Sequence, residues 1–124
     1  MRPADLAGYR NNPVYIRRSM HVPPSHEAVR DIMPAFFELL ANETNPAVRV
    51  VLGHFVFVYI HPYSDGNGRI GRFLMNTMLA SGGYPWIVIP VEKRHNYMEA
   101  LEQASVEQNI IPFTRFIGDF LNIS

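Results

Sequence analysis

Within residues 61–72, the sequence HPYSDGNGRIGR combines a histidine, an aspartate, three glycines, an asparagine and two arginines behind an apolar run. Glycines allow consecutive backbone N–H groups to turn inward around an anion, and a following helix adds the positive end of its dipole. Arg69 and Arg72 are one helical turn apart, so both guanidinium groups can bind phosphate oxygens. The stretch from Asp65 to Gly68, together with these arginines, predicts a polyphosphate site.

The same segment holds an acid–base group and a metal ligand. Asp65 offers one hard carboxylate, which suits Mg²⁺ because this ion shares its shell between few carboxylates, phosphate oxygens and water. His61, at the end of the preceding apolar run, would titrate near neutral pH and could accept a proton from a hydroxyl that attacks the phosphate. Base, metal ligand and anion site therefore lie in one short stretch.

Simpler interpretations of these residues remain open. DGNG alone is a common turn. An EF-hand loop also begins D-x-N, but here Asn76 stands where its bidentate glutamate belongs, which excludes that motif. His54, His61 and Asp65 have a spacing that zinc could use, although no HExxH pattern is present, and His54 is more typical of a core histidine. On helical spacing alone, Tyr97 is a core residue.

The elements around the segment indicate a mainly α domain with a small β element near its start. PVYIRRSMHV, residues 13–22, alternates weakly before Pro23-Pro24 and predicts a short exposed hairpin. Ser25 can cap a first helix, which should kink at Pro34. Three further helices are expected. One follows the quoted segment and ends at Gly82-Gly83, one covers residues 92–104, and one begins with Pro112 as its first residue.

Residues 47–60 give conflicting signals. VRVVLGHFVFVYI is rich in β-branched and aromatic residues, so propensity alone favours a buried strand. The length of the run and its Asn45-Pro46 start favour a helix that is apolar all round.

Length and composition limit the remaining possibilities. The 124 residues, 48% of them hydrophobic, can bury one core. Eleven basic and eleven acidic side chains cancel, and the chain has no cysteine. From this charge balance we expect the chain to bind neither nucleic acid nor an anionic membrane. The start, MRPADLAGYR, lacks an apolar targeting region, and the longest apolar run is too short to cross a bilayer. We expect a soluble, cytoplasmic protein.

HPYSDGNGRIGR resembles the signature HPFxDGNGRxxR of the Fic family, with Tyr63 in place of phenylalanine. The resemblance continues through Pro23-Pro24 before a helix, YIHP at the end of the apolar run, LMNxxLxxxGYP after the motif, and RHNYMEAL. It covers nearly the whole chain. It implies a Fic-type helical bundle with a short β-hairpin flap, formed by residues 1–124 as a single domain, and helical structure for residues 47–60. We expect this domain to be the catalytic core of a longer protein.

The resemblance implies an enzyme, a protein adenylyltransferase, that transfers AMP from ATP to a hydroxyl side chain of a target protein. By this resemblance, His61 is the general base and Asp65 holds Mg²⁺ on the α and β phosphates. Gly66, Asn67 and Gly68 form the anion hole, Arg69 and Arg72 bind phosphates, and Tyr97 walls the adenine pocket. The flap docks the target segment by strand addition; its residues are Tyr15, Ile16, Arg17, Met20 and Val22.

Two departures from the family pattern refine this expectation. Doc-like kinases of the family carry a lysine where this chain has Gly68, which favours nucleotidyl over phosphoryl transfer. Many members also carry an inhibitory [ST]xxxE[GN] helix whose glutamate pairs with the motif's second arginine, here Arg72, and this chain has no such stretch. Three explanations are open: the helix belongs to an N-terminal segment outside this chain, which we favour, it belongs to a separate protein, or it does not exist. The alternatives are a nucleotide- or partner-binding module without turnover, transfer of another group (UMP, GMP or phosphocholine), and removal of AMP.

Overall fold

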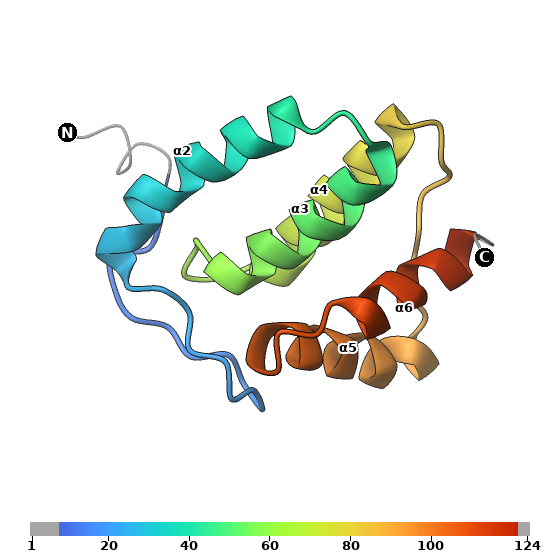
Figure 1. The fold of residues 1–124 in the computed structure, drawn as a ribbon. Coiled ribbons are helices and arrows are strands. Elements are labelled where there is room, and N and C mark those ends of the chain that lie inside the picture. Colours follow the sequence, from blue (N-terminus) through green and yellow to red (C-terminus); the bar gives the residue numbers. More distant parts are fainter. Residues whose placement is uncertain (1–7, 122–124) are drawn as a thin grey trace.

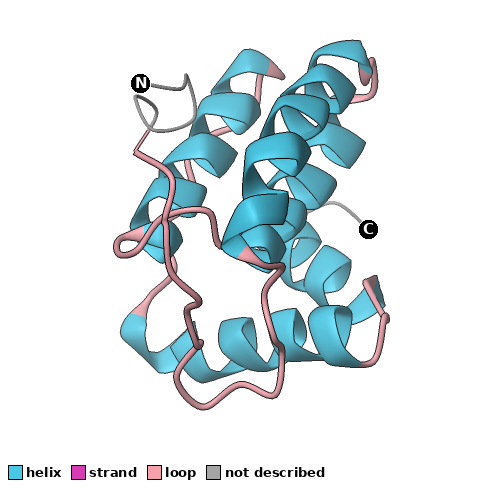
Figure 2. Cartoon of the chain, turned by 90° about the vertical axis from the view of Figure 1, so that its left-hand side faces the viewer, coloured by secondary structure: helices cyan, strands magenta, loops and turns pink. Residues whose placement is uncertain are grey.

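The computed structural model describes residues 8–121, and every regular element in that range is a helix (Figures 1 and 2). The helices are α2 (His26–Asn42), α3 (Pro46–Ile60), α4 (Asn67–Ser81), α5 (Arg94–Val106) and α6 (Ile111–Leu121), with a short 3₁₀ helix, η1 (Val91–Lys93), before α5. α3 and α4 lie side by side, α2 packs against α3, and α5 and α6 pack against each other and against α3. The prediction of a mainly α bundle is confirmed.

α3 settles the conflict over residues 47–60 in favour of a helix. The side-chain oxygen of Asn45 accepts hydrogen bonds from the N–H groups of Ala47 and Val48, at 3.0 and 3.3 Å, and Pro46 occupies the first turn. Neighbouring helices cover α3 on several sides and bury Val50, His54, Phe57 and Ile60, whereas Val48, Leu52 and Tyr59 stay exposed. Capping and tertiary packing outweigh the strand propensity of its valines and aromatic residues.

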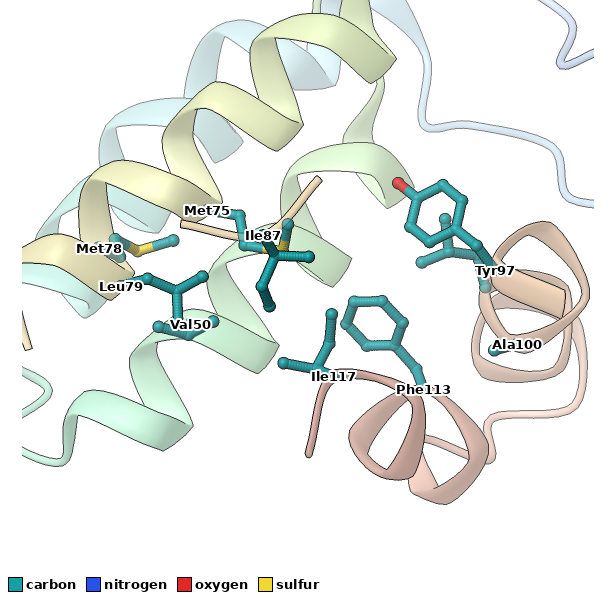
Figure 3. Close-up of a cluster of buried hydrophobic side chains, with 10 residues drawn as sticks. Val50, Met75, Met78, Leu79, Ile87, Tyr97, Ala100, Phe113 and Ile117 are labelled. Carbon is teal, nitrogen blue, oxygen red and sulfur yellow. The ribbon is translucent and has the colours of Figure 1, made fainter. Parts of the chain in front are cut away.

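Two hydrophobic clusters meet at α3 and fix its position. Burial of one large apolar side chain contributes about 1.5–3 kcal/mol, so clusters of this size hold α3 firmly from two sides. The cluster between α3, α4, α5 and α6 contains Val50, Met75, Met78, Leu79, Ile87, Tyr97, Ala100, Leu101, Phe113 and Ile117 (Figure 3). The cluster between α2 and α3 contains Val29, Met33, Phe36, Phe57 and Ile60.

α4 approaches α3 closely at Gly71, just behind the DGNG turn. A Cβ atom at this position would lie 3.1 Å from the ring of Phe57 and 3.2 Å from Cγ1 of Val58. The absence of a side chain at Gly71 therefore brings the first turns of α4 against the last turns of α3. At its other end α4 stops at Ser81, followed by Gly82 and by Gly83 with φ 85°, as the sequence predicts.

The predicted β-hairpin at residues 13–22 is wrong. The chain does reverse there, through a turn in which the N–H of Ser19 donates to the carbonyl of Ile16 at 3.2 Å and Arg18 has φ 63°. No strand ladder forms beside the turn among the described residues. An isolated two-stranded ribbon is marginal at best, and here the polar groups next to the turn bind α5 instead. The hydroxyl of Ser19 and the N–H of Met20 donate to the carboxylate of Glu102, at 2.5 and 2.7 Å.

The remaining helices begin and end close to the predicted positions. The hydroxyl of Ser25 accepts a hydrogen bond from the N–H of Ala28 and caps α2, which continues past an exposed Pro34 to Asn42. The kink expected at Pro34 stays a prediction. α6 begins one residue earlier than expected, at Ile111, whose N–H is capped by the side chain of Asn109. No helix within residues 8–121 combines the length and apolarity that crossing a bilayer requires.

Candidate active site

The segment 61–72 runs from the end of α3 into the first turns of α4. His61 follows the last residue of α3 and adopts the left-handed conformation, with φ 52° and ψ 61°. Its carbonyl oxygen accepts a hydrogen bond from Nε of Arg10 at 2.7 Å. The turn therefore directs His61 out of the helix axis, next to the start of α4.

The surroundings of His61 favour its neutral form. Desolvation by burial lowers the pKa of the imidazole, the backbone of Val58 opposes this, and the positive charge of Arg10 and the nearby His21 lower the pKa further. At neutral pH the ring is thus unprotonated and able to accept a proton, as a general base must be. Nδ1 is buried and makes no fully formed hydrogen bond among the described residues.

The side chain of Asn67 locks the loop rather than facing outward. Its oxygen accepts from the N–H of Tyr63 at 2.8 Å, and its amide nitrogen donates to the carbonyl of Tyr63 at 2.7 Å. The residue is 3% exposed. Any contribution of Asn67 to anion binding must therefore come from its backbone N–H, in the first turn of α4.

The N-terminus of α4 is free to bind an anion. Gly66 precedes it with φ 79°, and no side chain caps the first N–H groups of the helix. Asp65 and Arg69 are both exposed beside this helix start. A Cβ atom at Gly68 would lie 3.1 Å from Nη1 of Arg72, so the absence of a side chain here lets the guanidinium of Arg72 lie against the turn. The structure thus brings together an uncapped helix dipole, a carboxylate and two guanidinium groups.

A buried hydrogen-bond chain supports Arg72 from the core. Nδ1 of His54 lies 2.9 Å from the carbonyl of Gly71, which can only accept, so Nδ1 carries the proton. Nε2 must then accept from the hydroxyl of Tyr97, 2.6 Å away. Tyr97 in turn interacts with the side chain of Arg72, while desolvation by burial, the largest effect, raises the pKa of Tyr97 to about 12. His54 is fully buried with both ring nitrogens bonded, which confirms it as a core histidine.

A cavity of about 330 Å³ opens between the start of α4, residues 86–89 and the start of α5. Its lining includes three guanidinium groups, those of Arg69, Arg72 and Arg94, and no carboxylate. The other lining residues are Phe73, Asn76, Trp86, Ile87, Val88, Ile89 and Tyr97. The cavity therefore suits an anionic ligand with an apolar portion.

Tyr97 is at once a core residue and a wall of this cavity. It is 3% exposed, and its ring centroid lies 5.9 Å from that of Phe116 and 6.4 Å from that of Phe113. Its assignment to an adenine pocket stays a prediction. Arg94 stands one turn before Tyr97 within RHNYMEAL, but an exposed helix arginine carries no signal of its own.

The residues predicted to dock a target lie on the turn that Glu102 anchors. Tyr15, Met20 and Val22 are 85%, 80% and 73% exposed. Arg17 is exposed and Ile16 half-buried. Their role in docking stays a prediction.

Sequence reasoning did not single out two buried residues near the site. Arg10 is 1% exposed and contacts the end of α3, and His21 is 8% exposed with its ring 4.2 Å from that of Tyr59. The sequence gives no signal for these two residues, because their partners are backbone carbonyls rather than charged side chains. Only their burial in the folded chain identifies them.

Residues 2–79 match the model of the Fic/DOC family, and the chain belongs to this family. It is 40% identical over 120 residues to the protein adenylyltransferase Fic of Nematostella vectensis, covering 94% of this chain and 27% of that protein. It is also 40% identical over 121 residues to the protein adenylyltransferase Fic of Drosophila willistoni, covering 94% and 24%. The chain thus spans about a quarter of the length of these relatives.

Solved structures of the family share the fold. A Fic domain containing signaling protein from Bacteroides thetaiotaomicron superposes with a TM-score of 0.80 at 29% identity, over 91% of this chain and 50% of that one. Fic-1 from C. elegans superposes with a TM-score of 0.79 at 28% identity, over 90% and 33%. The helical bundle described above is therefore a Fic fold.

Proposed function

We propose that this chain transfers AMP from ATP to a hydroxyl side chain of a target protein. One observation carries the proposal: His61, whose lowered pKa favours a neutral imidazole, ends α3 six residues before Asn67, where α4 starts uncapped with Arg69 and Arg72 in its first turns. Such an arrangement suits a base acting next to a bound polyphosphate. The names of the curated relatives, protein adenylyltransferase Fic, support the same activity.

The proposed reaction is an in-line displacement at the α-phosphate. Nε2 of His61 takes the proton of the target hydroxyl as its oxygen forms a bond to the α-phosphorus. The bond from the α-phosphorus to the oxygen that bridges to the β-phosphate breaks, and pyrophosphate leaves. The N–H groups of Gly66, Asn67 and Gly68 and the side chain of Arg69 hold the phosphate oxygens, where negative charge gathers.

Asp65 fits a magnesium ion that is carried by the nucleotide. Within residues 8–121 no group of three or more histidine, cysteine or carboxylate side chains could hold an ion alone. A single exposed carboxylate is what Mg²⁺ uses when phosphate and water complete its shell. When bound, the ion would neutralise charge on the phosphates, while Asp65 orients it.

Arg72 is the proposed point of inhibition. Its guanidinium lines the cavity and no carboxylate within the described residues forms an ion pair with it. A helix from outside this chain that carries the glutamate of an [ST]xxxE[GN] motif could pair with Arg72. The carboxylate would then repel the nucleotide's terminal phosphate, so transfer would stop.

The test compares labels on different phosphates of ATP. Purified chain, incubated with Mg²⁺ and [α-³²P]ATP, should label itself and a target protein, and mass spectrometry should find AMP on a hydroxyl side chain. [γ-³²P]ATP should give no label. Label from the γ position would instead indicate phosphoryl transfer, and binding of ATP without either label would indicate a module without turnover.

Two substitutions separate the proposed roles. His61→Ala should abolish transfer but leave the affinity for ATP nearly unchanged, whereas Arg69→Ala should weaken ATP binding, measured by calorimetry. His95→Ala is the matched control, because His95 is an exposed histidine on α5. Equal loss of ATP affinity in the His61 and Arg69 variants would contradict this division of roles.

A further inference from the structure

Arg10 is the largest side chain that the structure buries completely, at 1% exposure. Among the described residues, its guanidinium is held by backbone carbonyls. Nε donates to His61 at 2.7 Å, Nη2 donates to Ile60 at 3.2 Å and to Pro24 at 2.5 Å, and Nη1 donates to Asn12 at 3.2 Å. Burial of an arginine is costly, so an arrangement in which one guanidinium joins Asn12 and Pro24 to a short stretch at Ile60 and His61 needs a reason.

That stretch is the end of α3, where four successive carbonyls receive a donor from the N-terminal segment. The ring of His21 donates from Nε2 to Tyr59 at 2.8 Å. The side chain of Arg10 donates to Ile60 and His61, and its backbone N–H donates to Pro62 at 2.9 Å. The last carbonyls of a helix have no partner within the helix, and a cation beside them is favoured by the helix dipole.

The contact with His61 fixes an unusual backbone conformation. A histidine with φ 52° and ψ 61° departs from the helical path, and this conformation costs energy in any residue that carries a Cβ atom. Arg10 bonds to the carbonyls of Ile60, His61 and Pro62, and so contacts the backbone before, at and after His61. They hold the peptide planes that determine where the imidazole points.

We propose that Arg10 is a positioning residue of the active site, which holds the backbone of His61 in its left-handed turn and so aims the imidazole at the nucleotide. This inference rests on the proposed role of His61 as the base. Arg10 touches no reacting atom in this account and acts only through His61.

The charge of Arg10 adds a second effect. Burial is the main cause of the lowered pKa of His61, and Arg10 and His21 are the charged or titratable side chains that lower it further. Loss of the positive charge at position 10 should therefore raise the pKa of His61. If Arg10 only stabilised the fold, loss of its charge would leave the pKa of His61 unchanged.

Two changes at position 10 separate geometry from charge. Arg10→Lys keeps the charge but has no planar fork, so it cannot span Pro24, Ile60 and His61 together. Arg10→citrulline keeps the shape and most donors but is neutral. Citrulline can be introduced by ligating a synthetic 1–40 peptide to residues 41–124 through a cysteine at the junction. That cysteine is then desulfurised to Ala41, a selective step because the chain has no other cysteine.

The first readout needs no turnover. Titration of the His61 ring signals by NMR, assigned through the His61→Ala spectrum, should give a higher pKa in the citrulline protein and a value close to wild type in Arg10→Lys. This experiment remains valid if the chain transfers no AMP, so failure of the proposed function is distinguishable from failure of this inference. An unchanged His61 pKa in the citrulline protein would overturn the electrostatic part.

The second readout is the rate of self-labelling with [α-³²P]ATP. Arg10→Lys should lower kcat tenfold or more, because a misplaced base reacts poorly, and should leave KM for ATP within about twofold. In the citrulline protein the acid limb of the pH–rate profile should move to higher pH. Arg30→Gln is the control, since Arg30 also donates to the N-terminal segment, at Asn11, but does not contact α3 through that bond.

Folding of each variant is checked by circular dichroism and thermal unfolding. The positioning role is overturned if Arg10→Lys, folded as wild type, keeps its kcat, or if Arg30→Gln loses as much activity as Arg10→Lys. If Arg10→Lys fails to fold, Arg10→Gln takes its place, since its shorter amide cannot span Pro24, Ile60 and His61 together, and an unchanged kcat in that variant overturns the positioning role.

Discussion

The buried His54 should make the stability of the fold depend on pH. Desolvation by burial, the largest effect, lowers the pKa of His54 to about 4 from an ordinary 6.5. Because the folded pKa lies below the unfolded one, the unfolded chain binds more protons between these values. The stabilisation from the neutral ring is complete above pH 6.5 and is lost as the pH falls toward 4.

The size of the effect follows from the gap between the two pKa values. The gap corresponds to about 3 kcal/mol in total, and most of it should be lost between pH 7.5 and pH 4.5. His54 has no exposed surface, so solvent does not screen this effect. Protonation would also put a hydrogen on Nε2, the atom that now accepts from Tyr97.

The assay is urea unfolding followed by circular dichroism at pH 7.5 and pH 4.5. The wild-type free energy of unfolding should fall by about 2–3 kcal/mol more than that of His54→Gln, whose side chain does not titrate. His95→Gln, which changes an exposed histidine, should behave as wild type. If His54→Gln loses as much stability between the two pH values as wild type does, the buried ring is not the cause and the reasoning is refuted.

Three further predictions concern the metal, residues 85–89 and regulation. Asp65→Asn should raise the Mg²⁺ concentration needed for half-maximal self-labelling, and activity that persists in EDTA would contradict this. Asn76→Ala should lower the free energy of unfolding by about 2 kcal/mol, because the side chain of Asn76 pairs with both backbone groups of Ile87 at 2.7 and 3.0 Å. The loss should also shift the emission spectrum of Trp86, the only tryptophan, and an unchanged spectrum would argue against the prediction. The chain should label itself without an activating substitution, and an added helix with an [ST]xxxE[GN] motif should suppress this labelling. Arg72→Glu should label itself less than wild type, because Arg72 binds phosphate, but the added helix should not lower that labelling further.

The sequence is sufficient for most of the fold and for the local part of the site. HPYSDGNGRIGR spans the turn between α3 and α4 and the first turns of α4, so neighbours in sequence are also neighbours in space. Helix caps such as Ser25 and Asn45 were readable because capping depends on residues within the same turn. The helical state of 47–60 was uncertain from propensity and depended on family resemblance, since only tertiary packing decides it.

Contacts to backbone atoms explain what the sequence did not reveal. Arg10 bonds to carbonyls that are 50 and 51 positions away, and a carbonyl has no residue type by which to recognise it. The hairpin ladder was wrongly predicted because weak alternation over 13–22 gives no information on Glu102, which binds the polar groups beside the turn. The cavity combines Arg69, Trp86 and Arg94 from separate elements, which no local pattern relates.

The pairing of Asn67 with Tyr63 has a consequence for the kinetics of binding. The two hydrogen bonds close the loop on itself, so the entropy of ordering these residues is lost during folding and not when a ligand arrives. An anion that reaches the start of α4 meets a receptor that is already in shape, and its association needs no conformational step. Its residence time on this loop is then governed by the contacts broken on leaving, rather than by how often the loop opens.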